Sequence, residues 1–176
     1  MRAPRRTLRG GYPVPGHAKS MKRIFVAMGI ATLAVAMAAP LALADLELDG
    51  TAGNDTITGS AGKDRINGLG GDDRLNGWAG RDQIRGGADA DVIVGGKGND
   101  VLIGEGGNDV IRGGAGVDEI VGGYGKDRIF GGAGSDIIRA ESGGADYIDC
   151  GGGLHDVAFV DAFDTVTGCE KVDVQS

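Results

Sequence analysis

A nine-residue repeat runs without a gap from Gly50 to Arg139, in ten consecutive copies. Its pattern is G-G-x-G-x-D-x-U-x, where U is a large aliphatic residue. The first position is Gly and the eighth is Ile or Leu in all ten copies. The sixth position is always aspartate: Asp55, Asp64, Asp73, Asp82, Asp91, Asp100, Asp109, Asp118, Asp127 and Asp136. Three columns fixed over so many copies require one structural unit that is repeated along the chain.

Each repeat is predicted to form a tight turn followed by a short strand. Glycine at positions one, two and four is expected to give the backbone positive φ angles, so that six residues can turn. The remaining three residues predict a strand whose middle side chain points to one face. One inward aliphatic side chain per repeat cannot close a core, but stacked coils can bury a continuous row of them. The sequence therefore predicts an all-β solenoid.

The aspartate column indicates a metal. Stacked coils lie about 4.8 Å apart, so the carboxylates would form columns of like charge that repel one another unless a cation lies between them. Carboxylate and turn carbonyl oxygens are hard ligands, and a flexible set of them suits Ca²⁺ better than Mg²⁺. We therefore predict several calcium ions per chain. Position five varies between oxygen donors such as Asn54, Asn99 and Asn108 and the basic Lys63, Arg81 and Lys126. Ligand quality should therefore differ between coils.

The repeat block resembles the RTX, or hemolysin-type calcium-binding, nonapeptide-repeat family. The resemblance implies a right-handed parallel β-roll with two repeats per coil and with calcium held between the loops of repeats n and n+2. The position-six carboxylate and the carbonyls near positions two and four would come from one loop, and the carbonyls near positions one and three from the other. Asp100 with the carbonyls of Gly96 and Gly98 would form one half of a site, and Asp109 with Gly107 would lie on the opposite edge. Besides the ten repeat aspartates, the ligands so predicted are Asp146, Asp156, Gly53, Gly62, Gly71, Gly80, Gly96, Gly98, Gly107, Gly116, Gly125, Gly134, Asn54, Asn99 and Asn108.

Six residues depart from the glycine pattern of the family, and four of them are large or charged. The two small ones, Thr51 and Ser60, stand at position two of the first two repeats. Leu69, Trp78 and Glu105 stand at position two, and Asp89 stands at position four. The family's loop geometry is therefore not assured in these four repeats.

The segment before the repeats is typical of an export leader. Residues 21–44 contain a basic start, an apolar core and the triplet Ala42-Leu43-Ala44, which together predict a signal peptide cleaved before Asp45. The alternative is a transmembrane anchor, for which the apolar core is short. Residues 1–20 are interpreted as an upstream extension, either an over-extended translation start or a functional basic segment. Residues 45–149 are assigned to the roll.

Residues 150–176 are predicted to form a C-terminal cap that covers the last coil. The spacing of the aspartates stretches to ten residues at Asp146 and Asp156, and bulkier side chains follow. Cys150 and Cys169 are the only cysteines. An even pair in an exported chain favours a disulfide, with two free thiols as the alternative.

Charge and motifs exclude several function classes. Residues 1–44 carry seven basic and no acidic side chains, so residues 45–176 carry 11 basic and 25 acidic ones. An acidic body argues against nucleic acid as a partner. No G-x-S-x-G, H-E-x-x-H or P-loop motif is present, and His155 is interpreted as an exposed loop residue. We therefore do not expect an enzyme.

Two functions remain after these exclusions. The first is a secreted calcium-binding β-roll that folds with Ca²⁺ and acts as a structural or surface-associated module. The alternative is a calcium-dependent module that binds polysaccharide or protein on its outer face, where Val92, Val94, Val101, Ile103 and Val121 could form an interface. After cleavage of the leader neither requires a membrane span.

Overall fold

A computed structural model describes residues 22–25, 45–140 and 142–175. The described chain is all-β and winds through two parallel sheets, consistent with the predicted right-handed β-roll. The first sheet contains β1 (Lys22–Phe25), β2 (Leu46–Asp49), β4 (Arg65–Gly70), β6 (Gln83–Ala88), β8 (Val101–Gly106), β10 (Glu119–Tyr124), β12 (Ile137–Ala140), β14 (Val157–Val160) and β16 (Lys171–Val174). The second contains β3 (Thr56–Thr58), β5 (Arg74–Ala79), β7 (Val92–Lys97), β9 (Val110–Ala115), β11 (Arg128–Ala133), β13 (Tyr147–Gly152) and β15 (Thr165–Thr167).

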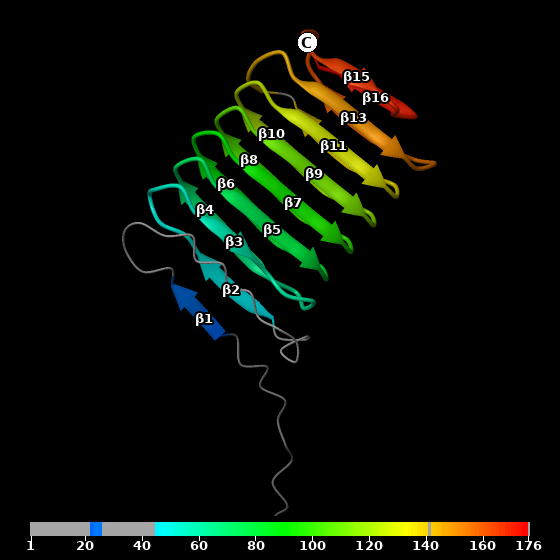
Figure 1. The fold of residues 1–176 in the computed structure, drawn as a ribbon. Helices are drawn as coiled ribbons and strands as arrows, with labels where there is room; N and C mark the ends of the chain where they lie inside the picture. Colours follow the sequence, from blue (N-terminus) through cyan, green and yellow to red (C-terminus); the bar gives the residue numbers. More distant parts are fainter. Residues whose placement is uncertain (1–21, 26–44, 141, 176) are drawn as a thin grey trace, which may run out of the picture.

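Successive repeats alternate between the two sheets, so each coil contains two repeats. Figure 1 shows the resulting stack, with turns along two opposite edges. The parallel register confirms the pairing of repeat n with repeat n+2, because Ile66 lies beside Ile84 and Ile93 beside Ile111. Most strands extend to six residues rather than the expected three, because pairing continues through positions one to three of the next repeat.

The core is a double row of aliphatic side chains between the sheets. The position-eight residues from Ile66 to Ile138 are at most 1% exposed. The row continues through Ile148 and Ala158 beyond the regular repeats, and it starts at Leu48 in β2. The predicted inward direction of position eight is therefore confirmed, with the alternating burial that a strand produces.

Glycine at position one is needed for space rather than for a left-handed backbone. The prediction of positive φ at all three glycine positions is wrong for position one and for Gly53 and Gly62 at position four. It is correct for the other position-four glycines and for the position-two glycines. A Cβ on Gly95 would lie within 3.0 Å of the Gly113 carbonyl oxygen and of the Asp100 carboxylate. Cβ atoms in folded proteins do not approach other heavy atoms this closely, so only glycine fits between the coils at this position.

Four of the six departures from the glycine pattern have the positive φ angle of the glycines that they replace. Leu69, Trp78 and Glu105 have φ angles of 85°, 75° and 78°, and Asp89 has 75°. A non-glycine residue in this region is strained by about 1–2 kcal/mol. The solenoid therefore imposes its turn on these residues.

The C-terminal residues extend both sheets. β14 and β16 continue the first sheet and β15 ends the second, so residues 150–175 form further coils. Cys150 and Cys169 are joined by a disulfide, as the sequence predicted. The leader predicted for residues 21–44 and the extension at 1–20 lie outside the described residues, apart from β1, which pairs with β2. The domain boundaries stay predictions.

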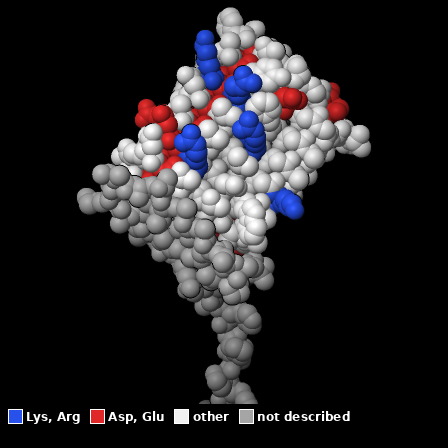
Figure 2. All heavy atoms as spheres, in the orientation of Figure 1, with Lys and Arg blue, Asp and Glu red and all other residues white. Residues whose placement is uncertain are grey.

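The apolar outer positions do not form one patch. Val92 and Val94 lie on β7 in the second sheet, whereas Val101, Ile103 and Val121 lie on the first. Consecutive repeats face opposite ways, so the group is divided between two surfaces. Figure 2 shows basic side chains standing out from the visible face, with the acidic ones mostly toward its margins.

Candidate metal centre

The aspartates stack into two columns, one at each turn edge of the roll. All twelve predicted aspartates are at most 6% exposed, which is exceptional for a charged side chain. Asp100 lies in the turn between β7 and β8 and Asp109 in the turn between β8 and β9, so they belong to opposite edges as expected. Asp91 and Asp109 belong to the same edge, because their repeats are adjacent in one sheet.

In eleven of the twelve aspartates, all but Asp55, Oδ1 accepts a backbone hydrogen bond from the neighbouring coil. The backbone N–H of Asp82 donates to Oδ1 of Asp100 at 2.8 Å, and that of Asp100 donates to Oδ1 of Asp118 at 2.8 Å. The same bond recurs at the other edge, from the Asp91 N–H to Oδ1 of Asp109 at 2.8 Å. This bond gives the aspartates a structural role, which the repeat pattern alone did not reveal.

The second carboxylate oxygen is buried without a hydrogen-bond partner in ten of the twelve aspartates. A buried polar atom without a partner is costly, and an unpaired buried charge is more so. The ten unpartnered Oδ2 atoms belong to Asp73, Asp82, Asp91, Asp100, Asp109, Asp118, Asp127, Asp136, Asp146 and Asp156.

Burial disfavours the charged form of these carboxylates. Desolvation raises the pKa of Asp73 and Asp109 to about 6 and that of Asp82 and Asp118 to about 7. The backbone hydrogen bond from the neighbouring coil opposes the rise, and repulsion from the aspartates above and below adds to it. The pKa values of Asp91 and Asp146 rise to about 7 for the same reasons, with desolvation the largest. A cation beside the Oδ2 atoms would reverse this preference.

Backbone carbonyls of each loop point at the next loop on the same edge. The position-two glycine Gly96 approaches the Trp78 carbonyl, and the position-four glycine Gly98 approaches the Gly80 carbonyl, so closely that a Cβ would collide with either oxygen. At position one, Oδ2 of Asp82 and the Gly95 carbonyl both crowd the Cβ position of Gly77. The space between two loops is thus faced by one unpartnered carboxylate oxygen and by carbonyls from both loops.

Most of the predicted glycine ligands have this orientation. The carbonyl oxygens that crowd the next coil include those of Gly62, Gly80, Gly96, Gly98, Gly107, Gly116, Gly125 and Gly134. Gly53 differs, because Gly71 approaches its carbonyl carbon and the Asn54 backbone nitrogen most closely. Opposite Gly71 the next coil has Asp89 at position four, and Oδ2 of Asp89 accepts a hydrogen bond from the Gly71 N–H at 3.3 Å.

The amide oxygens at position five have a hydrogen-bonding role. Oδ1 of Asn54 accepts from the backbone N–H of Asp72 at 3.0 Å, and Oδ1 of Asn99 accepts from that of Val117 at 3.0 Å. Oδ1 of Asn108 likewise accepts from the Lys126 N–H at 2.8 Å. These side chains are exposed and tie neighbouring coils together. Their role as metal ligands stays a prediction.

Two carboxylates of the columns were not among the predicted residues. Oδ1 of Asp164 accepts from the Asp146 N–H at 2.9 Å, and Oε2 of Glu170 accepts from the Asp156 N–H at 2.7 Å. Asp164 follows Asp146 by 18 residues, the length of one regular coil, so the spacing could have identified it. Glu170 follows Asp156 by only 14 residues, a spacing that the repeat does not predict.

The donor set fits Ca²⁺. Nowhere in the described part of the chain do three or more His, Cys, Asp or Glu side chains gather around one point. An ion between two loops would therefore take most of its ligands from backbone carbonyls, a hard and flexible oxygen set that Ca²⁺ accepts. The unpartnered Oδ2 atoms would supply the charge.

A parallel solenoid with a buried carboxylate column at each turn edge is the architecture of a metal-binding repeat protein. The sequence pattern of the RTX calcium-binding nonapeptide repeat, four copies, matches residues 49–84, 85–120 and 112–148. The chain belongs to this family of calcium-binding repeats. No match was found among the curated proteins.

Proposed function

We propose that this protein is a secreted β-roll whose folding depends on Ca²⁺ and that it acts as a structural or surface-associated module. The observation that carries the proposal is the set of ten buried carboxylate oxygens without a partner. Without a counterion they oppose the compact state, whereas ions between the loops would stabilise it. Binding and folding would then be one equilibrium.

The architecture supports strong coupling between the ions and the fold. The core is a narrow double row of Ile and Leu, and each coil contacts only its neighbours. Such a solenoid is stabilised by the sum of its interfaces between coils. Most of those interfaces contain both the aliphatic rows and unpartnered aspartate oxygens, so removing the ions weakens many interfaces at once.

Circular dichroism during a calcium titration tests the proposal. The chain should change from coil-like to β-rich as Ca²⁺ rises, and its hydrodynamic radius should fall. Extracellular calcium modules bind at about 10⁻⁴ to 10⁻³ M per site, so the midpoint should lie there and Mg²⁺ should not replace Ca²⁺. A chain that is compact and β-rich in excess chelator would contradict the proposal.

A variant pair locates the effect in the columns. Replacing Asp100 and Asp109 with Ala should move the folding midpoint to higher Ca²⁺. Glu119→Ala is the matched control, because this acidic side chain adjoins Asp118 but is exposed and paired with Arg139 at 2.9 Å. It should leave the midpoint nearly unchanged, since exposed ion pairs contribute little.

Secretion and the lack of catalysis belong to the same proposal. The support for secretion is the leader pattern of residues 21–44, and N-terminal sequencing of exported protein should begin at Asp45. In the described residues no helix is long and apolar enough to cross a membrane. The structural role is supported by the recurrence of the same unpartnered carboxylate oxygen in ten loops, whereas an active site would need a single distinct arrangement.

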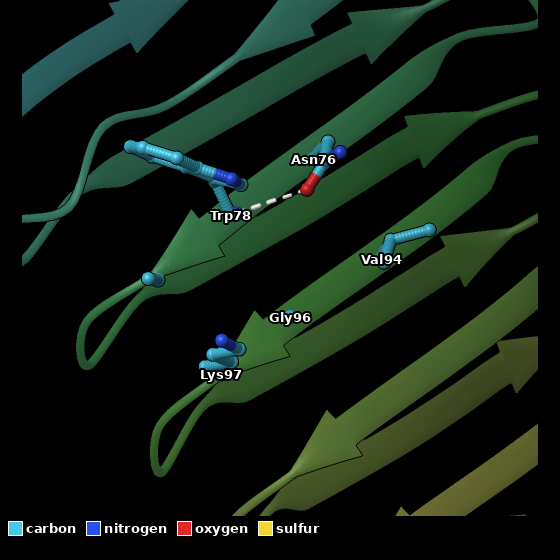
Figure 3. A pocket seen from close by; sticks show the side chains of 6 residues that line it. Asn76, Trp78, Val94, Gly96 and Lys97 are labelled. Atoms are coloured by element: carbon cyan, nitrogen blue, oxygen red, sulfur yellow. Dashed lines mark hydrogen bonds between the residues drawn. The ribbon is translucent and has the colours of Figure 1, made fainter. Parts of the chain in front are cut away.

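A second candidate function is ligand binding on the outer face of the second sheet. A hollow of about 410 Å³ lies between β5 and β7 and is lined by Asn76, Trp78, Ala79, Val94, Gly96 and Lys97. Trp78 is 58% exposed, and its backbone N–H donates to Oδ1 of Asn76 at 2.9 Å (Figure 3). An exposed aromatic ring beside amide and ammonium groups suits a polysaccharide or a protein segment.

Tryptophan fluorescence tests this candidate directly, because Trp78 is the only tryptophan. Titration of calcium-loaded protein with soluble polysaccharides should change the emission if a ligand occupies the hollow. Lys97→Gln should then weaken the response, whereas Lys126→Gln, at position five of another loop, should not. An unchanged emission with every polysaccharide, and with candidate protein partners, would exclude the hollow as a binding site.

A further inference from the structure

The first two aspartates of the repeat block differ from the ten that follow them. Oδ2 of Asp55 accepts hydrogen bonds from the Thr51 backbone N–H at 2.6 Å and from the Thr51 hydroxyl at 2.9 Å. Oδ2 of Asp64 accepts from the backbone N–H of Ser60. Protein donors within the same loop therefore satisfy the oxygen that is left unpartnered from Asp73 to Asp156.

The hydroxyl residue at position two produces this difference. The Thr51 hydroxyl also accepts from the Gly53 N–H at 3.2 Å, and the Ser60 hydroxyl accepts from the Gly62 N–H at 3.1 Å. Neither Thr51 nor Ser60 has the positive φ that position two has from Leu69 onward. The two loops thus close around their own carboxylate through a side-chain turn.

The last carboxylates of the columns are also held by protein groups. Oδ2 of Asp164 accepts from the Asp161 N–H at 2.9 Å, while its Oδ1 accepts from Asp146. The disulfide between Cys150 and Cys169 lies at the same end. The roll therefore has two ends closed by hydrogen bonds or a disulfide, with all ten unpartnered oxygens between them.

We infer that Asp55 and Asp64 hold no calcium ion and that their loops form an ion-independent end of the roll, with occupancy beginning at Asp73. This inference deepens the proposed function and rests on it. Each coil is stabilised by the neighbour on which it stacks. An N-terminal coil that is folded without ions gives the calcium-dependent coils a surface on which to stack. The two parts are joined by the hydrogen bond that the Asp55 N–H donates to Oδ1 of Asp73 at 2.7 Å.

Ion counting by equilibrium dialysis of the full chain at saturating Ca²⁺ tests the inference. The variant Asp55→Asn/Asp64→Asn should bind as many ions as the unchanged protein. The same chemical change in the middle of the roll, Asp100→Asn/Asp109→Asn, should lower the number. Equal losses in the two double variants would overturn the inference.

A gain of binding provides the second arm. The double variant Thr51→Gly/Ser60→Gly removes the two hydroxyl side chains that hold these turns and restores the glycine of the repeat at position two. The number of bound ions should then rise by one or two. Leu69→Gly is the matched control, because it also restores glycine at position two but in a loop whose Asp73 Oδ2 is already unpartnered. It should leave the ion number unchanged. A count that stays constant in Thr51→Gly/Ser60→Gly would also overturn the inference.

The outcomes separate this inference from the proposed function. If the unchanged protein binds no calcium, the proposed function fails. If it binds calcium and the end loops respond like the middle ones, only the inference fails. Hydrogen exchange gives a readout that does not depend on the variants: at limiting Ca²⁺, amides of β4 should be protected more than those of β8. Equal protection at every calcium concentration would contradict the ion-independent end.

Discussion

At the residue scale, the glycine at position one shows how little space separates the coils. A Cβ on Gly104 would lie within 3.0 Å of the Gly122 carbonyl oxygen and of the Asp109 carboxylate. Both atoms belong to the space assigned to the ion, so a methyl group here disturbs packing and ligation together. Gly106, at position three of the same repeat, has no contact closer than 4.0 Å.

The variant Gly104→Ala is therefore expected to destabilise the calcium-loaded protein by about 1–3 kcal/mol, the usual cost of overpacking. Chemical denaturation at saturating Ca²⁺ measures the free energy of unfolding. Gly106→Ala is the control and should cost less. Similar losses in both variants would show that the close approach at position one is unimportant.

At the scale of elements, a disulfide fixes the irregular strands at the C-terminal end of the roll. The position-one column changes after Gly131 to Ala140, Cys150 and Val160, which are buried, and the spacing of the aspartates lengthens to ten residues. The larger side chains occupy the space that glycine leaves open in the regular repeats. The disulfide connects β13 to the segment between β15 and β16 and so fixes the last coil.

Replacing Cys150 and Cys169 with Ser is expected to lower the free energy of unfolding by about 3 kcal/mol, the loop-closure value for a loop of this size. The loss should appear as early exchange of amides in β14 to β16, with β6 and β8 protected as before. Denaturation and hydrogen exchange at saturating Ca²⁺ measure the two effects. Unchanged protection of β14 to β16 would mean that packing alone holds the end.

At the scale of the whole molecule, the aspartate columns couple folding to pH. Burial raises the pKa of Asp82, Asp91 and Asp118 to about 7, well above the ordinary value of 3.8. A group whose pKa is raised by folding contributes its full stabilisation of the folded state at pH values below the pKa that the group has in the unfolded chain. That contribution is lost as the pH rises through the pKa that the group has in the folded state.

The calcium-free roll should therefore become more compact as the pH falls from about 8 to about 5, because protonation replaces the missing counterion. Circular dichroism and hydrodynamic radius in chelator, recorded across this range, give the measurement. In the presence of Ca²⁺ the same acidification should shift the folding midpoint to higher calcium, since protons and ions compete for the carboxylates. A chelated chain that is equally expanded at both pH values would contradict this coupling.

The sequence by itself determined the features that recur in every repeat. Inward Ile and Leu and the aspartate columns were predictable from residue spacing and side-chain chemistry. The pairing of repeat n with repeat n+2 came from the resemblance to the RTX family, and the link between Cys150 and Cys169 came from an even pair of cysteines in a chain expected to be exported. Asp164 was also within reach, since it keeps the 18-residue spacing.

Only the tertiary structure decided what each repeated group contacts. The lack of space at position one and the hydrogen bond to Oδ1 both depend on atoms of a neighbouring coil. The hydrogen bonds to Oδ2 of Asp55 and Asp64 depend on the particular turn that each of these two loops forms. The alternation of sheets likewise divided Val92 and Val101 between opposite faces. A repeat pattern fixes the unit, but the contacts between units appear only when the coils are stacked.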